Sequence, residues 1–249
     1  MKLQGKTVLI TGGAKRIGRE IALTLAKRGA AVIVHYRNSR QKAQDLQKQI
    51  RDLRGECFIV QADFFSRSGP VLPAITGFLR EVYRTVPAVD VLVNNASLFY
   101  PTPIEKISEK DWDELMTVNL KAPFFLARQI GLRMKQEGAG KIINLVDWTA
   151  TSPRARYVPY AVSKAGLIAA TQGLAKNLAP EVQVMGIAPG PILPAEHASP
   201  EEREAVRKKS LLKRYGDPKD IAEAVRFLIE GTDFMTGTVM TIDGGASLV

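Results

Sequence analysis

The sequence has 249 residues, of which 45% are hydrophobic, so one domain of this length can bury a substantial core. Its 35 basic and 25 acidic residues give a net charge of +10 that is spread along the chain, which favours a small phosphate-bearing ligand over nucleic acid. The single cysteine excludes an intrachain disulfide, and with only two histidines we expect no metal site.

No linker, repeat or low-complexity tract divides the chain, so we expect a single domain over residues 1–249. The first residues lead directly into a strand-like run, without the apolar segment of a secretory signal or a membrane span. We therefore expect a cytoplasmic protein with no membrane partner.

Residues 11–18, called the glycine turn below, follow a buried strand-like run and precede a helical pattern. A strand, a turn and a helix N-terminus form an anion cradle, because free N–H groups and the helix dipole both face a bound phosphate. The middle glycine of a full dinucleotide fingerprint is missing, so an ordinary strand-to-helix turn remains the alternative. The residues expected to hold the cofactor here are Thr11, Gly12, Arg16, Ile17 and Gly18.

Apolar runs suited to buried parallel strands alternate with amphipathic helical stretches, of which residues 39–54 are an example. This alternation predicts right-handed crossovers and an α/β fold: a Rossmann-type doubly wound parallel sheet with helices on both faces. Ligands of such sheets lie at the carboxyl ends of the strands. The expected strands are 8–10, 31–34, 58–60, 89–93, 142–146, 182–187 and 238–242.

The second strand is followed by Arg37, Asn38 and Ser39, with no acidic residue. Sites for NAD usually place an acid here to bind the ribose hydroxyls, whereas a 2′-phosphate calls for arginine and small hydroxyl donors. This end of the strand therefore predicts that the cofactor is NADP(H). The alternative is that Arg37 is simply solvated and binds no phosphate. Asp63, after the third strand, is placed either to accept from the adenine amino group or to form a turn.

Tyr160 and Lys164 follow the fifth strand with a spacing that puts both side chains on one face of a helix. A phenol with a pKa near 10 is a poor acid or base at neutral pH, but a nearby ammonium group favours its ionised form. Such a pair can move a proton while a nicotinamide moves a hydride. Tyr215 and Lys219 repeat the spacing, but Pro218 between them argues against a helix there.

Several further residues occur in the order found in one large family of oxidoreductases. They are Thr11, Gly12, Gly18, Asp63, Asn94, Asn95, Ala96, Asn119, Tyr160, Lys164, Pro189, Gly190 and the closing Asp243-Gly244-Gly245. With these residues the chain resembles the short-chain dehydrogenase/reductase family over essentially its whole length.

That resemblance implies a role for each matching residue of the site. Tyr160 is the proton donor, Lys164 lowers its pKa and holds the nicotinamide ribose, and Asn119 supports a water-linked proton relay. Asn95 and Ala96 belong to the cofactor site, which Pro189 and Gly190 border at the nicotinamide. The resemblance also implies a homotetramer built through carboxyl-terminal elements.

Two positions depart from the family pattern. Arg16 replaces the middle glycine, and Asp147 replaces the serine expected thirteen residues before Tyr160. A serine hydroxyl can donate to a carbonyl oxygen, whereas an ionised carboxylate repels that oxygen's lone pairs. Asp147 therefore argues against a plain ketone and suits a substrate with N–H donors or a ring nitrogen that must be protonated. Capping the loop that follows is its alternative role.

The same departures resemble the pteridine reductase subgroup of that family. In that subgroup the pterin lies between the nicotinamide and a phenylalanine, here Phe99, while Ser97 and Arg16 fix its polar edge and Asp147 and Tyr160 supply protons. The resemblance implies NADPH-dependent reduction of a dihydropterin or related pterin. Phe99 as a core aromatic, and Arg16 as a ligand of the cofactor phosphates alone, remain alternatives.

Two other functions stay open. The first is a reductase of 3-oxoacyl thioesters or another ketone on the same scaffold; the second is a non-catalytic nucleotide sensor or nucleic-acid-binding protein. The Asp-Tyr-Lys set argues against a sensor, and the lack of interleaved aromatic and basic residues argues against nucleic acid. Residues 191–213 contain three prolines and then a charged helical stretch, and we expect them to form a substrate-loop lid.

Overall fold

The computed structural model describes residues 1–65, 70–194 and 199–249. Within them the chain forms a seven-stranded sheet in the order β3-β2-β1-β4-β5-β6-β7, and every neighbouring pair of strands is parallel. The predicted doubly wound parallel sheet is confirmed. The strands are β1 Thr7–Ile10, β2 Ala31–Tyr36, β3 Cys57–Gln61, β4 Val91–Asn94, β5 Gly140–Leu145, β6 Val182–Pro189 and β7 Val239–Ile242.

The central strands are apolar because both faces of the sheet are covered. Two neighbouring strands show this burial, with no exposed side chain at residues 8–10 of β1 or 91–93 of β4. Such burial is expected for a parallel sheet between two helical layers. The apolar β-branched runs in the sequence therefore predicted each strand to within a few residues.

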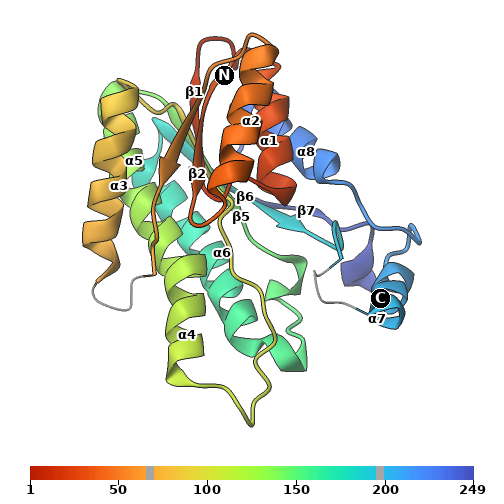
Figure 1. Cartoon of the computed structure of the whole chain (residues 1–249). Coiled ribbons are helices and arrows are strands. Elements are labelled where there is room, and N and C mark those ends of the chain that lie inside the picture. The colour runs from red at the N-terminus through yellow and green to blue at the C-terminus, as the bar shows by residue number, and fades with distance from the viewer. Residues whose placement is uncertain (66–69, 195–198) are drawn as a thin grey trace.

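Helices cover both faces of the sheet (Figure 1). Buried side chains of α1, α2 and α8 form one core with the sheet, and those of α3, α5 and α6 form the other. The predicted helix at 39–54 is confirmed as α2. The helices are α1 Arg16–Ala26, α2 Arg40–Asp52, α3 Val71–Thr85, α4 Glu109–Met116, α5 Ala122–Glu137, α6 Val158–Leu178, α7 Pro200–Lys209 and α8 Pro218–Glu230.

The strand order reverses at β1, which pairs with β2 on one side and β4 on the other. In open α/β sheets, ligands bind in the crevice beside such a reversal, at the carboxyl ends of the strands. The glycine turn follows β1 and Asn95 follows β4, so both lie at this crevice. The topology thus brings together motifs that are about eighty residues apart in the sequence.

The carboxyl-terminal third holds the predicted substrate loop, in which α7 confirms the charged helical stretch. The C-terminus lies beside α7, and the N–H of Leu212 donates to the carbonyl of Gly244 (Figure 1). Residues 195–198 of the loop lie outside the described residues. Tyr215 precedes α8, so it does not share a helix with Lys219, as expected. Among the described helices, none combines the length and apolar composition needed to cross a membrane.

Candidate active site

Thr11 and Asn95 bind the glycine turn to the end of β4. The Asn95 amide Nδ2 donates to the carbonyls of Thr11 and Gly12 at 2.9 and 3.0 Å. In return the Thr11 hydroxyl accepts from the backbone N–H groups of Asn95 and Ala96, each at 3.0 Å. Asn95 is therefore engaged with the turn, and its side chain shapes the site by fixing the backbone rather than by reaching outward.

The glycine turn is too compact for side chains at its glycine positions. A Cβ on Gly18 would lie 2.5 Å from both the Asn95 amide nitrogen and the Gly12 carbonyl oxygen, and Gly12 itself has a φ of +62°. Helix α1 begins immediately after Lys15, a residue whose side chain has no acceptor for the first N–H groups of the helix. The turn therefore offers backbone donors and a helix dipole to an anion, which fits a dinucleotide phosphate.

Arg16 occupies the position of the missing glycine in a backbone conformation that favours glycine. Its φ is +55°, which costs a side-chain-bearing residue roughly 1–2 kcal/mol. The guanidinium Nη2 donates to the carbonyl of Pro194 at 3.3 Å. Arg16 thus connects the glycine turn to the first part of the substrate loop, a contact that sequence reasoning did not anticipate.

The expected adenosine end of the site lies at the ends of β2 and β3. Arg37 is half-exposed, with its Nη1 3.9 Å from a carboxylate oxygen of Glu114, which is the outer limit of an ion pair. Asn38 is exposed and Ser39 directly precedes α2, where its side chain makes no cap bond. The Oδ1 of Asp63 accepts from the N–H of residue 65 at 3.0 Å, so its turn-forming role is present in the structure.

Asp147 uses its two carboxylate oxygens for two different partners. Its Oδ2 accepts from the Tyr160 hydroxyl at 2.8 Å. Its Oδ1 accepts from the backbone N–H of Thr149 at 2.7 Å and from the Thr149 hydroxyl at 2.6 Å. The capping role is therefore present in the structure together with a contact to Tyr160, while the catalytic role of Asp147 stays a prediction. The alternative role of Asp147, capping the loop before Thr149 and Thr151, is confirmed at Thr149.

Tyr160 and Lys164 are both buried on α6, and the pKa of each is shifted. Burial, and then the charge and hydrogen bond of Asp147, raise the pKa of Tyr160 well above its usual value, with Ser97 and Arg154 acting weakly in the other direction. Burial lowers the pKa of Lys164 to about 8, and the charge of Asp147 opposes this shift. The structure therefore contradicts the expected lowering of the Tyr160 pKa by Lys164.

The reason for this correction is geometric. The Lys164 ammonium donates to the carbonyl of Leu145 at 2.7 Å and lies 5.9 Å from the centre of the Tyr160 ring. The Asp147 carboxylate, in contrast, is in direct contact with the phenol oxygen. Burial disfavours the ionised phenol, and a negative charge at hydrogen-bond distance disfavours it further, so the protonated form is stabilised.

Asn119 lies in a π-helical turn, Thr117–Lys121, between α4 and α5. Its Oδ1 accepts from the Leu98 N–H at 2.8 Å and the Ser97 hydroxyl at 3.1 Å. Its Nδ2 donates to the Leu98 carbonyl at 3.0 Å and the Ser163 hydroxyl at 3.3 Å. The fully buried amide thus holds the segment that carries Ser97, while the expected water-linked relay stays a prediction.

Phe99 is a surface residue of the site rather than a core aromatic. Its side chain is 45% exposed. One face stacks on Tyr157 with ring centres 4.6 Å apart and planes 2° apart, and its ring meets Tyr160 edge to face at 4.8 Å. Sequence reasoning missed Tyr157, which ends the short turn Ala155–Tyr157 immediately before α6.

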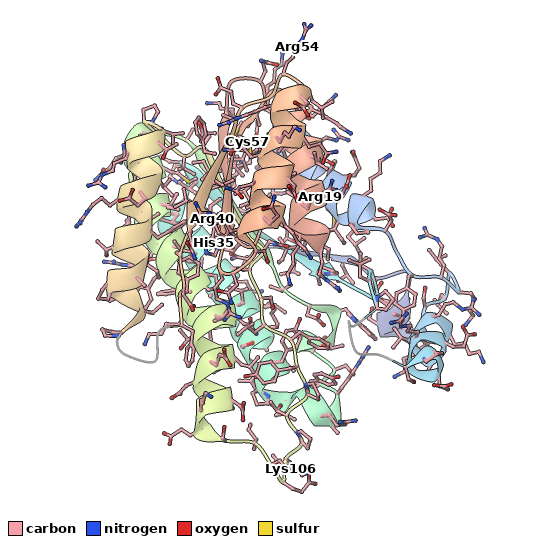
Figure 2. The ribbon with its side chains drawn as sticks, in the orientation of Figure 1. Arg19, His35, Arg40, Arg54, Cys57 and Lys106 are labelled. Atoms are coloured by element: carbon pink, nitrogen blue, oxygen red, sulfur yellow. The ribbon has the colours of Figure 1, made fainter. Side chains whose placement is uncertain are left out.

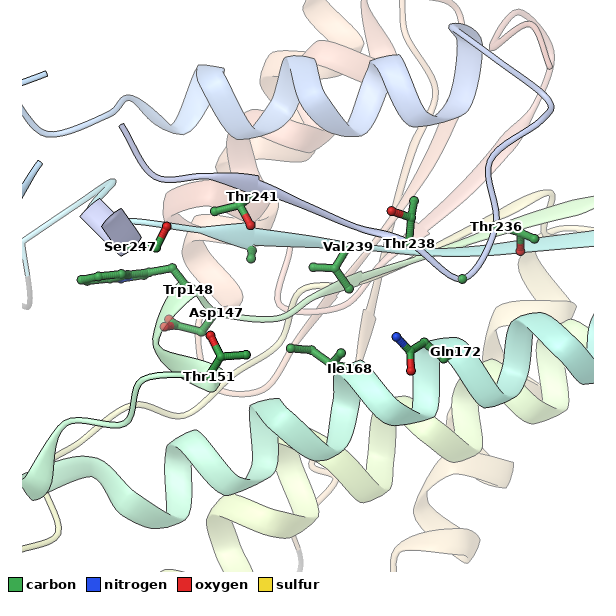
Figure 3. Close-up of a pocket in the computed structure, with 12 residues that line it drawn as sticks. Asp147, Trp148, Thr151, Ile168, Gln172, Thr236, Thr238, Val239, Thr241 and Ser247 are labelled. Carbon is green, nitrogen blue, oxygen red and sulfur yellow. The ribbon is translucent and has the colours of Figure 1, made fainter. Parts of the chain in front are cut away.

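A cavity of about 540 Å³ opens between α6 and the last two strands (Figure 3). Asp147 and Trp148 lie at one end of this cavity, with Ile168 and Gln172 of α6 on one side. Nearby, the N–H of Gly190 donates to the carbonyl of Ile242 at 2.9 Å, which ties the end of β6 to β7 just after Pro189. A Cβ on Gly190 would collide with the backbone of Asp243, so only glycine fits there.

The predicted site residues lie along one edge of the sheet in two groups. Direct contacts join Asp147 to Tyr160, Tyr160 to Phe99, and Ser97 to Asn119. The adenosine-end residues follow β2 and β3 at the same edge of the sheet. In the part of the chain that the structure describes, no three His, Cys, Asp or Glu side chains come together as a metal site requires.

A Rossmann topology, a glycine turn at the strand reversal and a buried tyrosine–lysine pair on α6 define a dinucleotide-dependent oxidoreductase. Residues 6–205 match the family model described as short chain dehydrogenase. The chain belongs to the short chain dehydrogenase family, as its sequence motifs predicted.

Similar proteins carry different names within that family. An uncharacterized oxidoreductase of Thermotoga maritima is 32% identical over 259 residues and covers all of both chains. A 3-oxoacyl-(acyl-carrier-protein) reductase FabG of Aquifex aeolicus is 33% identical over 250 residues, 98% of each chain. A crystal structure of FolM alternative dihydrofolate reductase 1 from Brucella suis in complex with NADP has a TM-score of 0.91 and 32% identity, covering 100% of this chain and 97% of that chain.

Proposed function

We propose that this protein is an NADPH-dependent reductase of a dihydropterin or dihydrofolate-like substrate. The observation that carries this proposal is the hydrogen bond from Tyr160 to Asp147, which puts a carboxylate where a ketone reductase needs a hydroxyl donor. The similarity to the FolM dihydrofolate reductase supports the same substrate class. The half-exposed ring of Phe99 beside Tyr160 offers a face for a flat heteroaromatic.

The glycine turn and the ends of β2 and β3 are the proposed cofactor site. Gly12 and Gly18 allow the tight turn whose backbone would bind the diphosphate, and Arg37, Asn38 and Ser39 supply the positive charge and polar groups that a 2′-phosphate requires. Asp63, Asn95 and Ala96 complete the adenosine side, while Pro189 and Gly190 border the nicotinamide. When bound there, NADPH supplies the hydride.

Tyr160 is the proposed proton donor for a ring nitrogen of the substrate. Its raised pKa keeps the hydroxyl protonated until hydride addition makes the ring nitrogen basic enough to take that proton. The Oδ2 of Asp147 orients that hydroxyl and attracts N–H groups of a pterin, which a carbonyl substrate lacks. Lys164, with a pKa of about 8, is a buried proton reservoir beside them.

The substrate's polar edge is assigned to Ser97 and Arg16. Asn119 holds the segment of Ser97 through its paired amide, so it orients the substrate edge in addition to its predicted part in a proton relay. Arg16 also contacts the start of the substrate loop 191–213, which we propose as a lid that excludes water from the reacting atoms. A cytoplasmic homotetramer is the proposed form of the enzyme.

Reduction of a 3-oxoacyl thioester is the second candidate, because the FabG relative is 33% identical over 98% of each chain. It requires Asp147 to be protonated or another group to bind the carbonyl oxygen. The test is NADPH oxidation by the purified protein with dihydrobiopterin, dihydromonapterin, dihydrofolate and acetoacetyl-CoA under one set of conditions. We expect turnover of at least one pterin; turnover of the thioester alone would reject the proposal.

A further inference from the structure

His35 is a buried histidine that the proposed reaction does not use. It lies in β2, is 3% exposed, and sits inside the fold where β2 approaches its carboxyl end (Figure 2). Its ring stacks on Phe64 with centres 4.6 Å apart and meets Phe78 edge to face at 5.2 Å. A histidine in such surroundings is expected to be a packing residue unless its nitrogens have specific partners.

Both ring nitrogens do have backbone partners, on two different loops. The N–H of Gly12 donates to Nδ1 at 3.1 Å, and Nε2 lies 3.1 Å from the carbonyl oxygen of Ala62. An N–H group can only donate and a carbonyl can only accept, so the partners assign an unprotonated Nδ1 and a protonated Nε2. The ring is therefore neutral, with one acceptor and one donor in use.

Burial keeps His35 in this state over the whole neutral range. It lowers the pKa of the imidazole from 6.5 to about 4, against smaller opposing effects of the Ala62 carbonyl and the Asp63 charge. Both hydrogen bonds consequently persist at the pH where a reductase works. The backbone adds a further connection, since the N–H of Gly13 donates to the His35 carbonyl at 3.0 Å.

The two loops joined by the ring are the two arms of the proposed cofactor site. Gly12 belongs to the glycine turn after β1, and Ala62 directly precedes Asp63 after β3. We propose that His35 is a positioning residue that sets the spacing between the phosphate-binding turn and the adenosine loop. This inference rests on the proposed cofactor site, and it assigns affinity for the adenosine 2′-phosphate half of the cofactor to a side chain that does not touch it.

The test replaces His35 with phenylalanine, which keeps an aromatic ring and removes both hydrogen bonds. Titration calorimetry with NADPH and with 2′,5′-ADP should give dissociation constants about tenfold higher, as expected for two neutral hydrogen bonds whose net worth is modest. The kcat at saturating NADPH should stay within about twofold, because the proton-transfer groups lie elsewhere. Nicotinamide mononucleotide should bind equally to both proteins.

Phe78→Leu is the control for packing, because Phe78 meets the rings of His35 and Phe64 edge to face but no side-chain hydrogen bond joins it to either loop. It should lower the thermal midpoint and leave the affinity for 2′,5′-ADP unchanged. Two further variants test the two ring nitrogens one at a time. His35→Asn keeps an acceptor near the position of Nδ1 and should recover most of the affinity for 2′,5′-ADP, whereas His35→Gln keeps a polar group near the position of Nε2 and should recover less.

An unchanged affinity for 2′,5′-ADP in His35→Phe, with only a lower thermal midpoint, would overturn the inference and leave His35 as a packing residue. If His35→Phe does not fold, equal affinities in the asparagine and glutamine variants would overturn it. Binding is measured without substrate, so failure of the pterin assay leaves this test intact. Failure of the wild-type protein to bind NADPH would instead reject the proposed cofactor site.

Discussion

Replacing Lys141 with methionine should strongly destabilise the protein, because its ammonium group closes the end of a helix inside the fold. Lys141 lies in β5 and is 2% exposed. Its Nζ donates to the carbonyls of Leu228, Ile229 and Thr232 at 3.1, 2.9 and 2.9 Å, and it lies 2.8 Å from the carboxylate of Asp233. Leu228 and Ile229 lie in the last turn of α8, where carbonyls lack helical N–H partners, so this one side chain satisfies both of them.

The loss in the free energy of unfolding follows from the carbonyls that methionine leaves without a hydrogen-bond donor. Hydrogen bonds from a charged donor are worth about 1.5–3 kcal/mol each, but carbonyls near the exposed Asp233 can recover some water, so we expect a loss of about 3–5 kcal/mol. Lys135→Met is the matched control. Its Nζ also donates to two carbonyls, at 3.2 and 3.3 Å, but its side chain is 38% exposed, so the loss there should be under about 1 kcal/mol.

Urea unfolding followed by tryptophan fluorescence measures both losses, with the midpoint shifted at an unchanged m-value. Because α8 packs against α1, the helix that begins in the glycine turn, Lys141→Met should also weaken NADPH binding near its unfolding midpoint. Equal midpoint shifts for the two variants would refute the argument from burial.

Three further predictions concern the site and its surroundings. Tyr160→Phe should keep NADPH affinity within about twofold and lower kcat by about 10²–10⁴; unchanged turnover in a spectrophotometric assay would refute the role of the phenol. Arg37→Ala should lower the affinity for NADPH by about tenfold or more relative to the affinity for NADH, because a charge-assisted bond to the 2′-phosphate is lost. Equal losses of affinity for the two cofactors in a fluorescence titration would reject the 2′-phosphate assignment. The pKa of His35 falls from 6.5 to about 4 on folding, so the unfolded chain binds its proton first as pH drops. The free energy of unfolding should therefore decline by up to about 3 kcal/mol between pH 6.5 and 4, and a flat profile from urea unfolding at each pH, matching that of His35→Phe, would contradict this.

The sheet and its helices could be predicted from the sequence because their signals are local. Fully buried runs such as 8–10 and 91–93 are apolar in any parallel sheet, and the spacing along 39–54 is that of one helical face. The order of motifs also placed Tyr160 and Lys164 on one helix. These features depend on neighbours in the chain, which the sequence contains directly.

Other features depend on contacts between distant segments. Burial raises the pKa of Tyr160 and the contact with Asp147 raises it further, and no spacing rule indicates that Asp147 touches the phenol. In the sequence, Lys141 is an ordinary charged residue near the start of a strand. Only the structure shows that its ammonium group bonds to carbonyls at the end of α8. His35 likewise reads as part of an apolar strand, since its two backbone partners are 23 and 27 residues away.

The central claim is that Asp147 selects a pterin over a ketone, and the Asp147→Ser variant tests it most directly. The measurement is the ratio of kcat/KM for the preferred dihydropterin to that for acetoacetyl-CoA, in the variant and in the wild-type protein. We predict that the ratio falls by at least about a hundredfold, because serine loses the attraction for ring N–H groups and gains a donor for a carbonyl oxygen. A ratio that stays within about threefold of the wild-type value would contradict the account.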